Sequence, residues 1–572
     1  MAPGLRVILW FGVILMALPL AVPVAAAVLP HAPLIPTEQE LARLGRVRSL
    51  LNSATPTRRQ PVHIVFYGQS ITIGPWWLTV ANELRRLYPN VDFRIENLAI
   101  SGFQDWALAR TVAADLIPLQ PDLVIFHAYG TDSGTDAFLR QLRQQTVSDV
   151  LVQTDHLHLD SSMEEETDPA KLFPQDVIPY RNYVRLPADC NRHGACLARV
   201  RDAWKAYCRS NNLAPRSLLA DGIHPNVDGY QLMAEFVLAH FQPGAAAEDP
   251  DHSQRAQTVT LGQEALWRAG VLECDFTGSS VMANWNGTLN QEIEVWVDGR
   301  RARERPELLG FSRVSAGHFS GWPALSHVGS AVPLLEETWT FTPFNVTTGG
   351  RNFAFRVSGS VTGPDGDGTN TARFVSKSGR VVIESGDHWI PLAVHFSGQK
   401  PLPPGFSATW STERQFHDPL MLGQQPPGDL RTRVRLVQGL TDGPHRLRLV
   451  HRGKTAPNLI ALNAYSPSGK AAIRDAVAEP PGVGRLGWKA TDKGVEVAWS
   501  ATLEGWLLES ARDLGDVRMW QPISELNYRK EAGMFRFDMT ADFAAQLFRL
   551  RPPLKGSTGG SVPPDQGQLE IP

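Results

Sequence analysis

Two patterns of apolar positions divide the chain. Between about residues 60 and 245, short apolar runs alternate with segments whose apolar residues recur at helical spacing; the first run, 63–67, ends at Gly68. Further strands are expected at 93–100, 123–129 and 149–154, and helices at 77–87, 105–116, 197–208 and 227–241. Continuous apolar strands alternating with helices predict an α/β domain, in which helices cover both faces of a parallel sheet.

One segment interrupts this rhythm. Residues 158–195 are acidic and contain proline, with three consecutive glutamates at 164–166. Runs of like charge usually lie on a solvated surface, so we interpret the segment as a surface loop, with a lid as the alternative.

Beyond a linker at 246–256, the apolar positions alternate with period two. Residues 292–297 end at Asp298-Gly299, a hairpin signal, and similar runs follow at regular spacing. The pattern predicts a multidomain chain with a β-sandwich at 257–470, a small β-sandwich at 485–552 and a disordered tail at 553–572. It leaves open whether 257–470 forms one sandwich or two small β-units.

The first residues have the pattern of a secretory signal. Arg6 precedes an apolar run from residue 7 to 22, and small residues follow to Ala27. The expected signal peptide is therefore 1–27, and a retained membrane anchor is the alternative. No later stretch has the roughly 18–20 apolar residues needed to cross a bilayer. The expected mature protein, from residue 28, is secreted or periplasmic and has no membrane partner.

Composition narrows the class of protein. The chain has 572 residues, a formal net charge of −3, 43% hydrophobic and 20% charged residues. This length predicts about three domains, and the near-neutral charge argues against a nucleic-acid partner. The four cysteines allow three disulfide connectivities: the loop from Cys190 to Cys196 is short enough to close, and Cys208 and Cys274 could form a second bridge. A zinc site is disfavoured because there is no C-x-x-C pair.

Candidate chemistry gathers in the α/β domain. Ser70 directly follows the first strand, and Asp221 stands three residues before His224 near the end of the domain. An aspartate at this spacing can orient an imidazole that activates a serine, so these residues fit nucleophilic acyl transfer. The backbone N–H groups of Ser70 and Gly102 are expected to stabilise the oxyanion.

These residues carry a resemblance to a known family. Gly68-Gln-Ser-Ile-Thr72, the segment 97–102 and Asp221-x-x-His224 resemble, in this order, three sequence blocks of the SGNH or GDSL-type hydrolases. The resemblance covers about residues 60–245 and implies a flavodoxin-like three-layer α/β domain. It implies Ser70 as nucleophile, His224 as base and Asp221 as its orienting partner, with Gly102 as an oxyanion donor. The implied reaction is ester hydrolysis without metal or cofactor.

Two positions depart from the family pattern. Gln69 replaces an aspartate that is not part of the triad, and Asp132 replaces an asparagine whose amide faces the oxyanion. An ionised Asp132 would repel the oxyanion, so it must be protonated, turned away or replaced by another donor. His127, Gln153 and His156 are candidate donors, although a structural role is favoured for each.

Other side chains have competing interpretations. Asp155, His156, His158 and Asp160 are residue types that can bind a metal ion. Side chains at the end of a strand are more often solvated, so a metal site is not favoured. The tryptophans beside Ser70 and in the β region could bind an acyl group or stack on sugar rings, but core packing is favoured. They are Trp76, Trp77, Trp285, Trp296, Trp339 and Trp389.

The sequence thus indicates a secreted serine esterase that removes acyl groups, acetyl first, from an acylated small molecule or polysaccharide. Its sugar specificity rests on analogy with exported relatives that carry β-domains. Two alternatives stay open: a polysaccharide O-acyltransferase on the same triad, and a carbohydrate-binding protein whose α/β domain has lost its activity. The sequence does not indicate an oligomeric state.

Overall fold

The structure is a computed structural model. It describes residues 34–130, 134–159, 161–244, 254–261, 267–285, 291–315, 321–398, 400–422, 432–453, 456–469 and 471–475, followed by shorter stretches between 487 and 570. The predicted signal peptide, most of the linker and Asp132 lie outside these residues. The described chain forms two compact units, residues 1–475 and 476–572.

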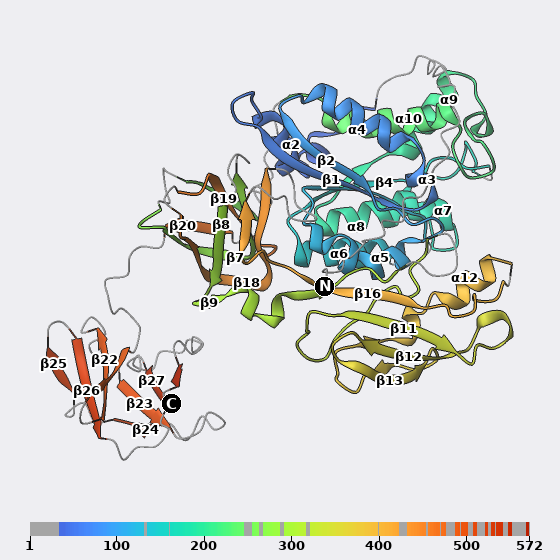
Figure 1. Cartoon of the computed structure of the whole chain (residues 1–572). Coiled ribbons are helices and arrows are strands. Elements are labelled where there is room, and N and C mark those ends of the chain that lie inside the picture. Colours follow the sequence, from blue (N-terminus) through green and yellow to red (C-terminus); the bar gives the residue numbers. More distant parts are fainter. Residues whose placement is uncertain are drawn as a thin grey trace, which may run out of the picture. The chain divides into compact units, whose positions relative to one another are not determined.

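A five-stranded parallel sheet organises the first half of the chain (Figure 1). Its strands are β1 (Gln60–Gly68), β2 (Val91–Asn97), β3 (Leu123–His127), β4 (Asp149–Gln153) and β5 (Cys196–Ala198). They lie in the order β2-β1-β3-β4-β5, which is the order of flavodoxin-like sheets. The prediction of a parallel α/β domain is confirmed. The strand expected at 93–100 ends earlier, at Asn97, where the chain leaves the sheet.

Helices cover both faces of this sheet. Successive side chains along each strand therefore pack into two different cores, one on each face. The helices are α1 (Glu38–Ala42), α2 (Gly45–Ser53), α3 (Ser70–Ile73), α4 (Trp76–Leu87), α5 (Asp105–Asp115), α6 (Gly134–Gln145), α7 (Val177–Tyr180), α8 (Leu186–His193), α9 (Val200–Ser210) and α10 (Val227–Leu238). Ile64 and Phe66 of β1 pack with α2, α4, α9 and α10, whereas Val65 and Tyr67 pack with α5, α6 and α8 on the opposite face (Figure 1).

The acidic segment is more structured than a solvated loop. It contains α7, a five-residue π-helical turn (Arg181–Arg185) and α8. Glu165, the middle glutamate of the run, has a side chain only 7% exposed, and its carboxylate lies 2.6 Å from both Arg201 Nε and Lys205 Nζ. The interpretation as a surface loop is therefore wrong for this residue, because two cations of α9 draw it inward.

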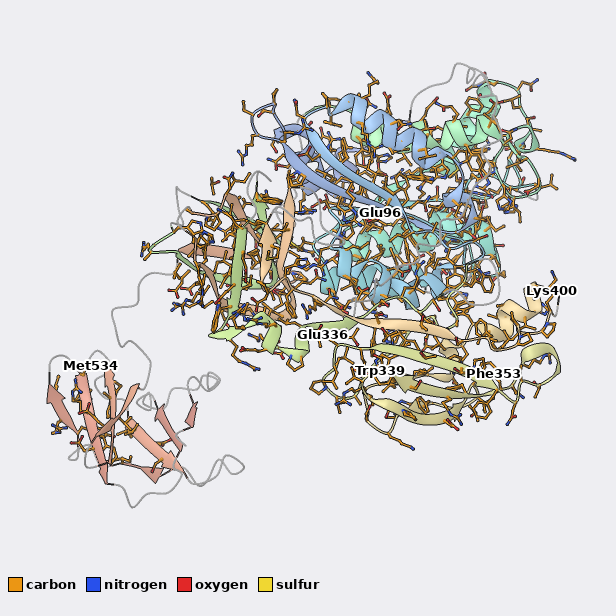
Figure 2. The ribbon with its side chains drawn as sticks, viewed as in Figure 1. Glu96, Glu336, Trp339, Phe353, Lys400 and Met534 are labelled. Atoms are coloured by element: carbon orange, nitrogen blue, oxygen red, sulfur yellow. The ribbon has the colours of Figure 1, made fainter. Side chains whose placement is uncertain are left out.

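The described residues of the region 257–470 form two large antiparallel sheets and one two-stranded sheet rather than one continuous β-unit. The eight-stranded sheet contains β6 (Ala256–Thr260), β7 (Val271–Trp285), β8 (Gln291–Val297), β9 (Arg300–Arg301), β17 (Leu420–Leu422), β18 (Arg433–His451), β19 (Leu459–Tyr465) and β20 (Ala472–Asp475). The five-stranded sheet contains β10 (Leu309–Phe311), β11 (Thr338–Phe344), β12 (Ala354–Gly359), β13 (Gly363–Thr369) and β16 (Ala408–Arg414). The second sheet is thus inserted between β9 and β17, and each sheet has its own core. Trp339 and Phe353, labelled in Figure 2, belong to the core of the inserted part.

Further short elements complete this inserted part. They are the hairpin β14 (Phe374–Val375) and β15 (Val382–Ile383), and the helix α12 (Ile390–Phe396).

Ion pairs on buried carboxylates connect both sheets to the α/β domain. Asp122, fully buried before β3, accepts hydrogen bonds from Arg433 at 2.7 and 2.9 Å and from Arg46 at 2.6 Å. Arg313, which follows β10, contacts the carboxylate of Asp115 on α5 at 2.5 and 2.6 Å. The first compact unit is therefore held together by charged groups as well as by apolar packing.

The second unit, 476–572, consists of two four-stranded sheets. Its strands are β21 (Gly487–Thr491), β22 (Gly494–Ser500), β23 (Leu507–Ala511), β24 (Gln521–Pro522), β25 (Arg529–Glu531), β26 (Met534–Thr540), β27 (Leu547–Arg551) and β28 (Gln568–Glu570). Trp499 is buried and stacks on Phe535 at 5.6 Å. β28 lies in the tail expected to be disordered, but it pairs with β27.

The suggested disulfides are absent. Cys190, Cys196 and Cys208 are buried thiols. Cys190 packs into the core on one face of the parallel sheet and Cys196 into the core on the other, so the sheet separates them. Cys208 belongs to α9 and Cys274 to the core of the eight-stranded sheet, which rules out the second pairing. Burial raises the pKa of the Cys208 thiol to about 11.

Within the described residues, no helix combines the length and apolar character needed to span a bilayer.

Candidate active site

Ser70 lies at the carboxyl end of β1, where the strand turns directly into α3. This turn requires a glycine before it. A Cβ at Gly68 would lie 2.1 Å from the backbone oxygen of His127 on the adjacent strand β3 and 2.3 Å from Thr72 Oγ1. The missing side chain therefore lets β1 and β3 approach closely and presents Ser70 at the edge of the sheet.

The structure brings Ser70, His224 and Asp221 together. Ser70 Oγ is 2.9 Å from His224 Nε2, and His224 Nδ1 is 2.9 Å from Asp221 Oδ2. With Nδ1 donating to the carboxylate, Nε2 can accept the hydroxyl proton of Ser70. The side chains of His224 and Asp221 are 38% and 58% exposed, so the group is open to solvent.

The loop that carries Asp221 and His224 is held by its own hydrogen bonds. Asp221 Oδ1 accepts the backbone N–H groups of Ile223 and His224, both at 2.7 Å. These two bonds, together with the bond from His224, lower the pKa of Asp221 to about 2. Asn226 then caps α10 by accepting from Gly229 N at 3.0 Å. The aspartate is therefore a carboxylate at any pH near neutrality.

The two backbone N–H groups expected to stabilise the oxyanion belong to Ser70 and Gly102. Neither Ser70 N nor Gly102 N donates to another group in the described part of the chain. Gly102 has φ +78°, a conformation that favours glycine, and Trp322 lies 3.0 Å from the position of a Cβ there. Asn97 links this loop to α3, because it donates to Thr72 O at 2.7 Å and accepts from Ala99 N.

A distant tryptophan supports the same loop. Trp322, from the inserted β part, donates through Nε1 to Ser101 O at 2.5 Å. Its ring packs edge-on against Phe103 at 5.3 Å, and Trp389 stacks on Phe103 at 4.4 Å. No local sequence signal connects Trp322 with Gly102, since 220 residues separate them in the chain.

The loop after β3 is held by the acidic segment. Arg181 donates to Asp105 at 2.9 Å and to Gly130 O at 3.2 Å, and Arg185 donates to Gly130 O at 2.6 Å. A Cβ at Gly130 would collide with Asp105 Oδ1 at 1.8 Å. Asp132, the candidate for the third oxyanion position, lies outside the described residues.

His127 and Gln153 lie at the last positions of β3 and β4 and are buried. Neither ring nitrogen of His127, and neither amide atom of Gln153, has a hydrogen-bond partner among the described residues. Burial lowers the pKa of His127 to about 4, despite Asp155 at 3.9 Å. These two side chains are therefore neutral polar groups just below the candidate site.

His156 braces the loop that carries the catalytic candidates. Its Nε2 is 2.7 Å from Ile223 O, and its Nδ1 is 3.3 Å from the Tyr129 hydroxyl. Burial lowers the pKa of His156 to about 3, so the ring is neutral and can donate only through Nε2 in this arrangement. Leu159 adds a backbone bond to Gly222 O at 2.8 Å. His156 thus contacts the loop beside His224, and we expect it to position His224 rather than to touch substrate.

We expect His156→Phe to lower kcat for ester hydrolysis by up to about 10²-fold, because a displacement of about 1 Å at a catalytic group has effects of this size. KM should change little, since His156 is not placed to contact substrate. His156→Gln, which keeps an amide donor, should recover most of the rate. Steady-state kinetics on 4-nitrophenyl acetate and melting temperatures check this. A lower melting temperature with unchanged kcat would show a purely structural role.

The remaining candidate residues take structural positions. Trp76, Trp285, Trp339 and Trp389 are at most 4% exposed, which confirms the interpretation as core residues. Trp77 and Trp296 are partly buried. Among the described residues, no group of three or more His, Cys, Asp or Glu side chains could hold a metal ion. Asp160 is not one of the described residues.

No protein-family model matches the chain, and no curated protein sequence matches it significantly. Among solved structures, 33 chains match. A catalytic mutant of an acetylxylan esterase from Geobacillus stearothermophilus is 16% identical, with TM-score 0.27, over 32% of this chain and 95% of the esterase. A GDSL-like lipase from Parabacteroides merdae is 18% identical, with TM-score 0.27, over 32% and 95%. A two-domain esterase active on acetylated mannans, co-crystallised with mannopentaose, is 11% identical, with TM-score 0.29, over 74% and 95%.

Proposed function

We propose that the protein is a secreted serine esterase of SGNH type that hydrolyses short acyl esters, acetyl first, on carbohydrate. The observation that carries the proposal is the continuous hydrogen-bonded path from Ser70 Oγ through His224 to Asp221, with both links at 2.9 Å. A serine, a histidine and a carboxylate in this order are the parts of acyl transfer through a covalent intermediate.

The mechanism follows from the directions of these bonds. Ser70 Oγ attacks the ester carbonyl while His224 Nε2 takes its proton, and Asp221 stabilises the resulting imidazolium. The N–H groups of Ser70 and Gly102 donate to the oxyanion of the tetrahedral intermediate. Its collapse breaks the bond between the acyl carbon and the sugar oxygen and leaves the acyl group on Ser70, while His224 gives its proton to that oxygen, which departs as a sugar hydroxyl. Water then attacks the acyl-enzyme with His224 again as base, which regenerates Ser70 and releases the acid.

The openness of the site favours a bulky substrate that carries a small acyl group. His224 and Asp221 are substantially exposed. Two apolar side chains close to the triad residues in the chain are exposed as well: Ile73, three residues after Ser70, is 48% exposed, and Ile223, next to His224, is 51% exposed. An ester on the surface of a polymer can reach such a site without entering a deep tunnel.

The proposal is tested with mature protein (28–572) on 4-nitrophenyl acetate and on acetylated xylan, with released acetate measured. We expect release from both substrates. A fluorophosphonate should inactivate the enzyme, and mass spectrometry should find the added mass on the peptide that contains Ser70. Labelling of another serine, or no acetate from either substrate, would contradict the proposal. A transferase would instead move the acyl group to an added sugar and release little acid.

A further inference from the structure

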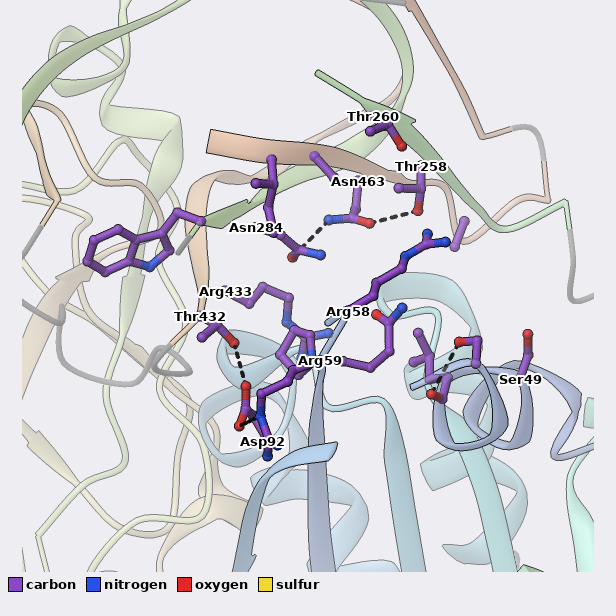
Figure 3. Close-up of a pocket in the computed structure, with 18 of the residues that line it drawn as sticks. Ser49, Arg58, Arg59, Asp92, Thr258, Thr260, Asn284, Thr432, Arg433 and Asn463 are labelled. Carbon is purple, nitrogen blue, oxygen red and sulfur yellow. Dashed lines mark hydrogen bonds and ion pairs between the residues drawn. The ribbon is translucent and has the colours of Figure 1, made fainter. Parts of the chain in front are cut away.

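A second candidate site lies at the opposite end of β1 from Ser70. A pocket of about 920 Å³ is lined by the first residues of β1 and β2, by α2, and by one end of the eight-stranded sheet (Figure 3). Gln60 and Pro61 belong to its wall, whereas Ser70 follows the other end of the same nine-residue strand. At about 3.3 Å per residue the strand holds the two sites roughly 26 Å apart.

The pocket carries an excess of positive charge. Four arginines and one aspartate are its charged lining residues: Arg46, Arg58, Arg59, Arg433 and Asp92. Arg59 pairs with Asp92 at 2.8 Å, and Arg46 and Arg433 share the single buried carboxylate of Asp122.

Arg58 is the arginine of this pocket that forms no ion pair with a described residue. Its side chain is exposed, and no carboxylate of the described residues pairs with its guanidinium. An anionic group of a ligand is the natural partner for such an arginine, because guanidinium binds carboxylate or phosphate through two parallel hydrogen bonds.

The facing wall carries neutral polar groups in a fixed arrangement. Thr258 Oγ1 donates to Asn463 Oδ1 at 2.7 Å, and Asn463 Nδ2 donates to Asn284 Oδ1 at 3.2 Å. This chain orients the amide of Asn284 and leaves its Nδ2 without a partner in the described structure. Figure 3 shows Asn284 and Arg58 on the walls of the same pocket, with Thr260 and Thr432 nearby. Amide and hydroxyl groups in such a row suit the hydroxyl groups of a sugar chain.

We propose that this pocket binds an acidic oligosaccharide, with Arg58 holding a uronate carboxylate and Asn284 a sugar hydroxyl. The volume exceeds what a single small anion needs and lies within the usual range for ligand pockets of roughly 300–1,000 Å³. The choice of carbohydrate over another anionic ligand rests on the proposed function, since a second sugar site on the same compact unit would retain the enzyme on its polymer.

The test uses the full mature chain with Ser70→Ala, so that binding does not depend on turnover. Calorimetry compares aldotetraouronic acid, a xylo-oligosaccharide with one glucuronate branch, with neutral xylotetraose and with inorganic phosphate. We expect the acidic sugar to bind at least about 10-fold more tightly than the other two, as expected for one charge-assisted hydrogen-bonded contact. Its affinity should fall with added salt.

Single substitutions test whether the acidic sugar binds at Arg58 and Asn284. Arg58→Ala and Asn284→Ala should each weaken binding of the acidic sugar, the first at least about 10-fold. Arg85→Ala, which removes an exposed arginine of α4 outside the pocket, is the matched control and should leave binding unchanged. Equal affinity for xylotetraose, equal affinity for phosphate, or no effect of Arg58→Ala would each overturn the proposal. If the esterase proposal failed, the wild type would release no acetate. This binding titration would be unchanged, so the two proposals can fail separately.

Discussion

Ser70→Ala is expected to lower kcat for ester hydrolysis by roughly 10⁴- to 10⁶-fold, the range found when the nucleophile of a serine hydrolase is removed. The residual rate would come from the N–H groups of Ser70 and Gly102 and from substrate binding. Folding should be unaffected, because within the described residues Ser70 Oγ makes one hydrogen bond, and its partner is the partly exposed His224. Acetate release from 4-nitrophenyl acetate and from acetylated xylan gives the rate, and a thermal melt gives the stability.

The control for this variant is Ser210→Ala, which removes an exposed serine at the end of α9 and should keep full activity. If Ser70→Ala kept a tenth or more of the wild-type rate, the nucleophile would have to be another group. If instead the variant lost its thermal transition, Ser70→Thr, which retains a hydroxyl, would separate a folding defect from a catalytic one.

Asp122→Ala is expected to destabilise the first compact unit by about 3–5 kcal/mol, because it removes the buried carboxylate that pairs with two largely buried arginines, Arg46 and Arg433. Burial opposes the ionisation of Asp122, but the charges of Arg433 and Arg46 outweigh it and hold the pKa of this carboxyl well below its usual range. The backbone N–H of His63 also loses its acceptor, at 2.8 Å in the wild type. Urea unfolding followed by tryptophan fluorescence measures the effect.

The pH dependence of the free energy of unfolding is a second test of the role of the Asp122 carboxyl. A carboxyl with a lowered pKa in the folded state stabilises the protein fully above its unfolded pKa, near 4, and less as pH falls toward the folded value. The stability difference between wild type and Asp122→Asn should therefore be constant above about pH 5 and shrink below about pH 4. Asp367→Asn, at an exposed pair with Arg356, is the control and should change stability little. A difference between wild type and Asp122→Asn that grows on acidification would contradict the assignment.

The positions of Ser70, Gly102, Asp221 and His224 were predictable because they depend on local rules. Parallel strands place their carboxyl ends at one edge, so residues that follow these strands meet there. A short turn at Gly68 and the three-residue spacing from Asp221 to His224 are likewise local features of the sequence. The structure brings Ser70, His224 and Asp221 into hydrogen-bond contact, and the catalytic role of all four residues stays a prediction.

The long-range contacts that hold the loops of the candidate active site were not predictable from the sequence. Trp322 reaches the Gly102 loop from the segment between β10 and β11, and Arg181 holds Gly130 from a segment interpreted as solvated. Such contacts depend on how distant elements pack, which periodicity does not report. The cysteines show the same limit: Cys190 and Cys196 are close along the chain, yet they lie on opposite faces of the parallel sheet.

The contact between Trp322 and the Gly102 loop has a consequence for biosynthesis. The α/β domain ends near residue 245, so the ribosome completes it before the codons for Trp322 and Trp389 are read. At about 5–20 residues per second, roughly 4–15 s of further elongation bring the ribosome to Trp322 and roughly 7–29 s bring it to Trp389. During this interval the nascent chain holds Ser70, Asp221 and His224 but lacks the indoles that support Ser101 and Phe103. We expect the enzyme to become competent only when the inserted β part has docked, after most of the chain has been made.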